Sequence, residues 1–161
     1  MKIFHLQKTQ FLPISLDEAW DYFSNPLNLM EITPPDLRMT PTSEIPAKMF
    51  RGEIITYTLT PMWGLTLTWV TEITHVKERR EFIDEQRFGP YKFWHHRHTF
   101  KEIENGVEVH DVVHYALPLG VFAIWLDAWW IKAQLEKIFS YRRQVLEDKF
   151  GKMNYQIQDQ R

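Results

Sequence analysis

The sequence VFAIWLDAWWIKAQLEKIFSYRRQVLEDKF, at residues 121–150, carries the longest helical pattern in the chain. In its second half, apolar residues recur at the i, i+3, i+4 spacing that gives a helix one apolar face. Its first half is apolar almost all round, with Asp127 as the only charged residue. A helix of this length would measure about 45 Å. We therefore predict a long helix near the end of the chain, whose first half needs cover on most sides.

The composition of the chain argues against several classes of protein. The formal charge of -2 gives no broad electrostatic reason to bind nucleic acid. The apolar run in the helix, about eleven residues, is shorter than the roughly 20 that cross a bilayer, so we expect no membrane insertion. The chain has no cysteine, and its first residues lack the pattern of a signal peptide. We expect a cytoplasmic protein with one domain at residues 1–150 and a frayed tail at 151–161.

Upstream of the long helix, the pattern predicts one strand, two short helices and a series of strands. Ser15 and Glu18 form a capping box that marks a helix start, and Pro26 can open a second helical turn. Such strands, joined by short connections and followed by a helix, predict an α+β fold in which about seven antiparallel strands curve around the helix. The strands are expected at 2–12, 37–42 (an edge strand), 53–60, 65–76, 81–88, 91–103 and 107–117.

The last two strands form a predicted hairpin. Its turn is Asn105-Gly106, the strongest short-range signal for a two-residue turn. Glu104 then pairs with Val107, and Asp111 becomes a diagonal neighbour of His98. One face of the hairpin is mostly apolar and is expected to face the core. It carries Trp94, His96, His98, Phe100, Val109, Asp111, Val113 and Tyr115.

Three segments resemble the SRPBCC, or START-like, helix-grip superfamily. They are DEAWDYFSNP at residues 17–26, GPYKFWHHRHTF at 89–100 and DVVHYALP at 111–118. With the order of elements, the resemblance spans about residues 3–150 and is nearest to the polyketide cyclase/dehydrase-like branch. It implies a cavity between the sheet and the long helix that holds a small hydrophobic molecule, such as a lipid, a polyketide or an aromatic compound. No pattern here carries over the catalytic residues of a cyclase.

Large aromatic side chains are the candidates for the lining of such a cavity. A concave face of seven strands is wider than the contact stripe of one helix, so side chains or a ligand must fill the remaining space. The alternative is that these side chains complete a packed core, as apolar clusters usually do. The candidates are Trp69, Phe82, Trp94, Phe100, Tyr115, Trp125 and Trp129.

Four polar residues are expected on the inner face of the hairpin, namely His96, His98, Asp111 and Tyr115. A buried polar group without a partner costs about 1–3 kcal/mol, so such groups are either paired or used. In the expected register, Tyr115 stands opposite His96, and Asp111 is within reach of His98. Three roles stay open: pairing with one another to stabilise the hairpin, orienting a ligand, or acid–base catalysis by His98 with Asp111 as its orienting partner.

His96 and His98 also have the spacing of two metal ligands on one strand face, with Asp111 as a candidate third ligand. The sequence places neither a fourth ligand nor a supporting shell, so we expect no metal and no other cofactor. The turn at residues 77–80 fixes no register, which leaves the facing of three further polar residues open: Tyr57, Asp84 and Gln86.

Three functions fit these observations, and we favour the first. The chain is a non-catalytic binding or carrier domain for a small hydrophobic molecule. Alternatively, it is a cyclase/dehydrase-like enzyme in which the His98–Asp111 pair moves protons in the same cavity. The third hypothesis is a domain that acts through protein contacts, in which Trp125, Trp129 and Trp130 form a patch for a partner or for a second copy in a homodimer.

Overall fold

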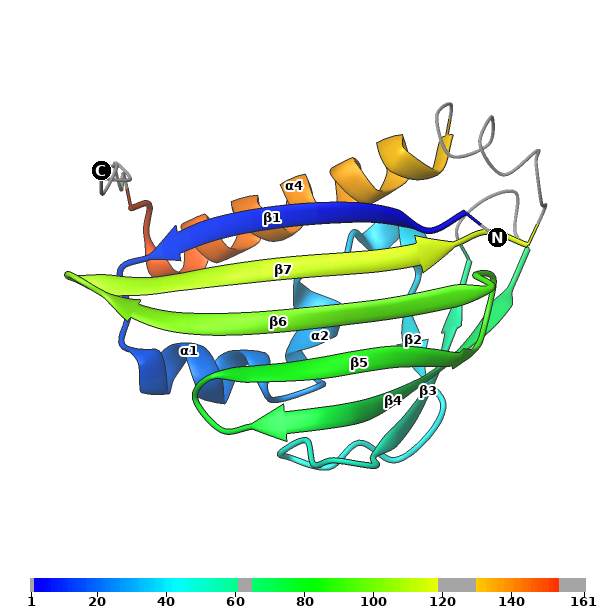
Figure 1. Ribbon diagram of the computed structural model, residues 1–161, viewed down its shortest axis with the longest axis horizontal. Coiled ribbons are helices and arrows are strands. Elements are labelled where there is room, and N and C mark those ends of the chain that lie inside the picture. The colour runs from blue at the N-terminus through cyan, green and yellow to red at the C-terminus, as the bar shows by residue number, and fades with distance from the viewer. Residues whose placement is uncertain (1, 61–64, 119–129, 154–161) are drawn as a thin grey trace.

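The computed structural model describes residues 2–60, 65–118 and 130–153. Its strands form one antiparallel sheet with the order β1-β7-β6-β5-β4-β3-β2 (Figure 1). The predicted α+β fold with a seven-stranded sheet is therefore confirmed. The strands are β1 Phe4–Leu12, β2 Thr40–Pro41, β3 Ile54–Leu59, β4 Leu67–Lys77, β5 Glu81–Phe88, β6 Phe93–Ile103 and β7 Gly106–Ala116.

Four helical segments accompany the sheet in the described ranges: α1 Leu16–Phe23, α2 Asn28–Glu31, the 3-10 helix η1 Pro35–Leu37 and α4 Lys132–Phe150. Figure 1 shows α4 running along the length of the sheet. The predicted long helix is confirmed from Lys132 onwards, whereas residues 121–129 lie outside the described residues. Residues 154–161 of the predicted tail also lie outside them. Among the described helices, none is both long enough and apolar enough to cross a membrane.

The predicted cap of α1 is present, because Ser15 Oγ accepts a hydrogen bond from the backbone N–H of Glu18 at 3.1 Å. The helix packs its apolar side chains against β6 and β7. The predicted edge strand at 37–42 is shorter in the structure. Pro35 begins η1, where its fixed φ and missing N–H are tolerated, and only Thr40–Pro41 pair with β3.

The β6–β7 hairpin is confirmed, but its register differs by two residues from the predicted one. Ile103 pairs with Gly106, so the turn is Glu104–Asn105 rather than Asn105–Gly106. Asn105 adopts the left-handed conformation, with a φ of 62°. A Cβ atom on Gly106 would lie 2.3 Å from the carbonyl oxygen of Leu12. The glycine is therefore needed where β1 meets β7, and asparagine takes the positive φ of the turn.

This two-residue shift preserves both faces of the hairpin, because side chains alternate with a period of two. The residues predicted to face inward do so. Their cross-strand partners change, however. His98 lies directly opposite Asp111, not diagonal to it, and Trp94 rather than His96 lies opposite Tyr115. The correction brings the His98 and Asp111 side chains closer than the predicted register did.

Two apolar clusters fill much of the space between the sheet and the helices. In the first, the Trp20 ring meets the rings of Phe82 and Phe100 edge-on, with centroids 6.2 and 5.6 Å away. We call this cluster the packed end: Leu12, Ala19, Trp20, Tyr22, Phe23, Ile32, Phe82, Phe100, Val107, Val109 and Leu146. The second lies under the start of α4 and comprises Leu6, Val113, Tyr115, Leu117, Ile131, Leu135 and Phe139.

The sheet bends where β4 meets β5. The pairing of these strands shifts register twice, between Val70 and Thr71 and between Ile73 and His75. Irregularities of this kind increase the local twist and bend a strand. The bent part of the sheet forms one wall of the cavity described next.

Candidate ligand-binding site

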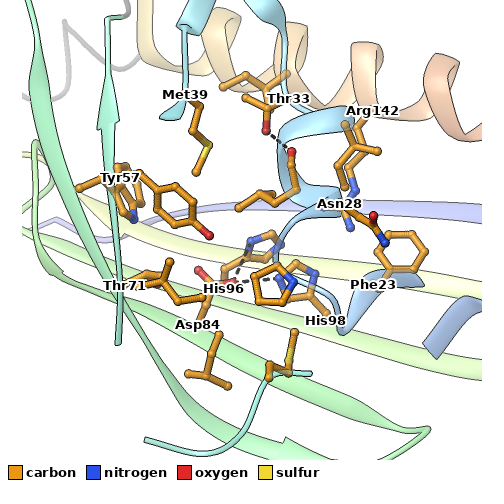
Figure 2. Close-up of a pocket in the computed structure, with 18 of the residues that line it drawn as sticks. Phe23, Asn28, Thr33, Met39, Tyr57, Thr71, Asp84, His96, His98 and Arg142 are labelled. Carbon is orange, nitrogen blue, oxygen red and sulfur yellow. Dashed lines mark hydrogen bonds and ion pairs between the residues drawn. The ribbon is translucent and has the colours of Figure 1, made fainter. Parts of the chain in front are cut away.

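A cavity of about 230 Å³ lies between the inner face of β3–β6 and the segments α2, η1 and α4 (Figure 2). Most of its wall is apolar. The sheet and α4 contribute, among others, Ile55, Trp69, Ile73, Trp94, Leu135 and Ile138. One group of polar side chains lies on the sheet, where Figure 2 shows Tyr57, Asp84, His96 and His98 close to one another. Other polar side chains, Asn28, Thr33 and Arg142, lie on the helical side.

Three neighbouring strands position the polar cluster. His96 and His98 are two residues apart on β6 and therefore point to the same face. Asp84 on β5 pairs with His96, and Asp111 on β7 pairs with His98. The two imidazole rings lie side by side, with centroids 3.7 Å apart. Both histidines and Asp111 are more than nine-tenths buried.

Each imidazole ring lies between the two carboxylates. On one side, Asp111 Oδ1 lies 3.0 Å from His96 Nε2 and 2.7 Å from His98 Nδ1, although the angle at His98 Nδ1 is poor for a hydrogen bond. On the other side, Asp84 Oδ2 lies 2.9 Å from His98 Nε2 and 3.5 Å from His96 Nδ1. Arg142 on α4 lies 3.4 Å from Asp111 Oδ1 and supplies a positive charge. The cluster is thus a closed ring of alternating imidazoles and carboxylates.

The charges of the cluster shift the pKa values of its members. Burial opposes ionisation of Asp111, but the charge of Arg142 and the contacts with His96 and His98 outweigh it and hold the Asp111 pKa well below its usual range. The Asp84 pKa is lowered, because the two histidines outweigh the effect of burial. Burial and the neighbouring His98 lower the His96 pKa. Burial also disfavours the charged form of His98, but the two carboxylates outweigh it and raise the His98 pKa.

Tyr57 is a polar residue of the cavity whose hydrogen-bonding capacity is unused. Its side chain is 1% exposed, and its hydroxyl group has no hydrogen-bond partner among the described residues. Figure 2 shows the hydroxyl directed toward the part of the cavity that holds Asp84 and His96. Burial, with the charges of Asp84 and Glu53, raises the Tyr57 pKa, so the phenol stays protonated. It is a buried donor that faces open space.

The structure brings only part of the predicted site residues to the cavity. Trp69, Phe82, Trp94, His96 and His98 line it. Phe100 packs in the packed end and Tyr115 in the cluster under α4. Asp111 borders a second cavity, between β1 and α4, and contacts the wall of the first through the two histidines and Arg142. Trp125 and Trp129 lie outside the described residues.

Several residues of the site were missed or left open by the sequence. Tyr57 and Asp84 face the cavity. The sequence could not predict this, because no turn signal fixes the register of their strands. Gln86 instead bonds the backbone of Tyr91 and holds the turn between β5 and β6. Arg142 received no role, yet it is buried. Its position, three residues after Phe139 on the apolar stripe of α4, was the available signal.

Neither a protein-family model nor a curated protein sequence matches the chain. Solved structures do match it in fold. TTHA0849 from Thermus thermophilus has a TM-score of 0.68 and 11% identity over 91% of this chain and 96% of its own. The ginseng major latex-like protein 151 from Panax ginseng has a TM-score of 0.66 and 12% identity over 92% and 97%. Ara h 8.0201 has a TM-score of 0.60 and 11% identity over 91% and 99%.

These similarities cover nearly the full length of each neighbour at very low sequence identity. Similarity of this kind shows the fold and leaves the ligand and the activity undefined. With its seven-stranded antiparallel sheet and the long helix near the C-terminus, the chain has the helix-grip fold that these solved structures share.

Proposed function

We propose that this protein binds a small, mostly apolar molecule in the cavity between the sheet and α4. The observation that carries the proposal is the combination of an apolar wall with a buried Tyr57 hydroxyl that has no partner in the described part of the chain. A buried donor without a partner costs about 1–3 kcal/mol, and a ligand oxygen would recover this cost. Ligand sites commonly have such a design, with apolar walls and a few polar groups that fix orientation.

The cavity limits the size and the chemistry of the ligand. Its volume of about 230 Å³ is smaller than the roughly 300–1,000 Å³ of sites for drug-sized molecules. We therefore expect one or two rings, or a short branched chain. A single hydroxyl or carbonyl group would lie at the polar side, beside Tyr57 and Asp84.

Two measurements test the binding function. Native mass spectrometry of freshly purified protein should show a retained small organic molecule. Isothermal titration calorimetry with 2-naphthol, a two-ring probe with one hydroxyl group, should show one site. Tyr57→Phe removes only the phenol oxygen, and we expect it to weaken 2-naphthol binding by about 3- to 10-fold, the value of one hydrogen bond.

A cavity-filling variant provides the sharper control. Ile138→Trp on α4 places a large ring in the cavity, and we expect at least about tenfold weaker binding of 2-naphthol. Gln144→Trp adds the same ring to an exposed position of the same helix and should leave binding unchanged. Equal affinities for both variants, or no binding of 2-naphthol and no retained molecule in the wild type, would refute the proposal.

Acid–base catalysis is the second candidate function, and one observation favours it. His98 lies on the cavity wall with Asp111 at 2.7 Å on the side away from the cavity. A carboxylate in this position can orient an imidazole that exchanges protons with a bound molecule. With a candidate substrate in hand, His98→Ala would abolish turnover and retain binding if the protein is an enzyme. A carrier would show changed affinity and no turnover in either form.

A further inference from the structure

The polar end of the cavity has a second property, which concerns metal ions. Asp84, His96 and His98 each offer one ligand atom, and these three atoms lie within 4.8 Å of one another. Asp84 Oδ2 is 2.9 Å from His98 Nε2 and 3.5 Å from His96 Nδ1. Around an ion with bonds of about 2.0–2.1 Å, neighbouring ligand atoms are roughly 2.9 Å apart in octahedral and 3.3 Å apart in tetrahedral geometry. The two distances from Asp84 Oδ2 are close to these values, and the third spacing is at most 4.8 Å.

The opposite sides of both rings are already held. Asp111 Oδ1 lies 3.0 Å from His96 Nε2 and 2.7 Å from His98 Nδ1, the nitrogens that face away from Asp84. A carboxylate behind a ligating histidine is the usual support of a metal site, since it fixes the ring orientation and strengthens the imidazole as a ligand. Here one carboxylate accepts a hydrogen bond from His96 and lies beside His98 Nδ1 without hydrogen-bond geometry. The part of the supporting shell behind His96, which the sequence did not reveal, is therefore present.

The formal charge of the cluster also favours a cation. With neutral imidazoles, the carboxylates of Asp84 and Asp111 carry two negative charges, and Arg142 is the cation that the described part of the chain places against them. One negative charge then remains in a buried place, where a metal cation or a proton on His98 can compensate it. Asp84 and both rings line the cavity, and Tyr57 points toward the same place (Figure 2).

We propose that Asp84, His96 and His98 bind one divalent transition-metal ion, with Zn²⁺ as the best fit to two imidazoles and one carboxylate. Three protein ligands leave an open position, as in catalytic zinc sites, and that position faces the cavity. Asp84 is thus the third ligand in place of Asp111, which holds both rings. The Tyr57 hydroxyl donates a hydrogen bond to the water or ligand oxygen at the open position. The proposal needs no organic ligand, so it can fail or succeed independently of the proposed function.

The test is Zn²⁺ binding by the full chain after treatment with a chelator. Calorimetry with ZnCl₂ and elemental analysis after desalting should both give one ion per chain. Asp84→Asn keeps the shape of the ligand and removes its charge, and we expect at least about 100-fold weaker binding. Asp111→Asn keeps the three ligands and changes the group behind the rings, and it should weaken binding by about 10- to 100-fold. Co²⁺ should give the intense visible absorption of a four-coordinate site in the wild type and lose it in Asp84→Asn.

The outer face of the sheet supplies the matched control. His5, His95 and His114 lie in a row there, with ring centroids about 6 Å apart between neighbours. The double variant His95→Ala/His114→Ala removes two imidazoles of the outer face, and its Zn²⁺ affinity should stay within about threefold of the wild type. Circular dichroism verifies that each variant is folded, and His96→Gln replaces Asp84→Asn if the latter is not. Absence of a 1:1 site, wild-type affinity in the Asp84 and His96 variants, or loss of binding in the surface control would overturn the proposal.

Discussion

The packed end and the cavity differ although one sheet supplies a wall to both. Strand β6 contributes Phe100 to the packed end and Trp94 and His96 to the cavity. Over the packed end, α1 places four buried side chains against the sheet. Over the cavity, the described segments α2 and η1 place none, and the buried helical side chains there come from α4 and the last turn of α1. The covering segments, rather than the sheet, therefore decide which part of the inner face is filled.

The largest expected effect comes from truncating one aromatic side chain in each region and comparing the losses of stability. Phe100→Ala removes a buried ring between Trp20, Phe23 and Phe82, and we expect a loss of about 3–5 kcal/mol in the free energy of unfolding. Trp94→Ala enlarges a space that already exists beside a partly exposed ring, so the loss should be about half as large. Urea denaturation of both variants measures the difference. Equal losses would mean that the two regions are equally well packed.

The second prediction concerns substitutions that add side-chain volume instead of removing it. Val109→Phe in the packed end should destabilise the protein by about 1–3 kcal/mol, because a filled core has no room for a ring. Ile55→Phe, from a similarly buried position on the cavity wall, should cost less than about 1 kcal/mol, since its ring can enter the cavity. Urea denaturation checks both. A larger loss for Ile55→Phe would contradict the comparison.

The sequence predicted the parts of the molecule that depend on local patterns. Alternation in β6 and β7 placed Trp94, His96, His98 and Phe100 on the inner face, and the wrong hairpin register did no harm there because its error was an even number of residues. However, the wrong register failed to predict that His98 lies directly opposite Asp111.

The division between core and cavity could not be predicted, because it depends on the covering segments. Phe100 and Trp94 look alike in the sequence, and only the presence of α1 over one of them makes the difference. Asp84 and Tyr57 lie on strands whose turns fix no register. The role of Arg142 depends on the distance between α4 and β7, which follows from the assembled fold.

The third prediction concerns the start of α1, the cover of the packed end. Ser15→Ala removes the oxygen that accepts the Glu18 N–H, and loss of such a cap costs about 1 kcal/mol. We expect this loss in urea denaturation and an unchanged affinity for 2-naphthol, because Ser15 is not one of the described residues that line the cavity. Ser15→Asp retains a capping oxygen and should restore the stability. Weaker 2-naphthol binding in Ser15→Ala would show that the two regions are coupled.

The smallest expected effect concerns an unpaired polar atom next to β3, the strand that carries Tyr57. It tests whether this atom lowers the stability of the protein. Just before β3, Glu53 is buried. One of its carboxylate oxygens accepts the Phe50 N–H, and the other has no partner within the described ranges. Burial raises the Glu53 pKa above its ordinary value of about 4.5, so the folded state binds the proton more tightly than the unfolded state. The contribution of Glu53 to stability is complete below pH 4.5 and is lost as the pH rises through the raised pKa.

Glu53→Gln keeps an oxygen for the Phe50 N–H and cannot ionise. We expect it to raise the free energy of unfolding at pH 7, with a gain over the wild type that shrinks as the pH falls toward 4.5. Urea denaturation between about pH 4 and 7 measures the gain. The exposed Glu104→Gln removes the same charge from the surface and should stay within about 0.5 kcal/mol of the wild type. A gain that is constant with pH, or equal in both variants, would mean that net charge rather than burial is responsible. In that case, the buried charge of Glu53 would not lower the stability of the region beside the cavity.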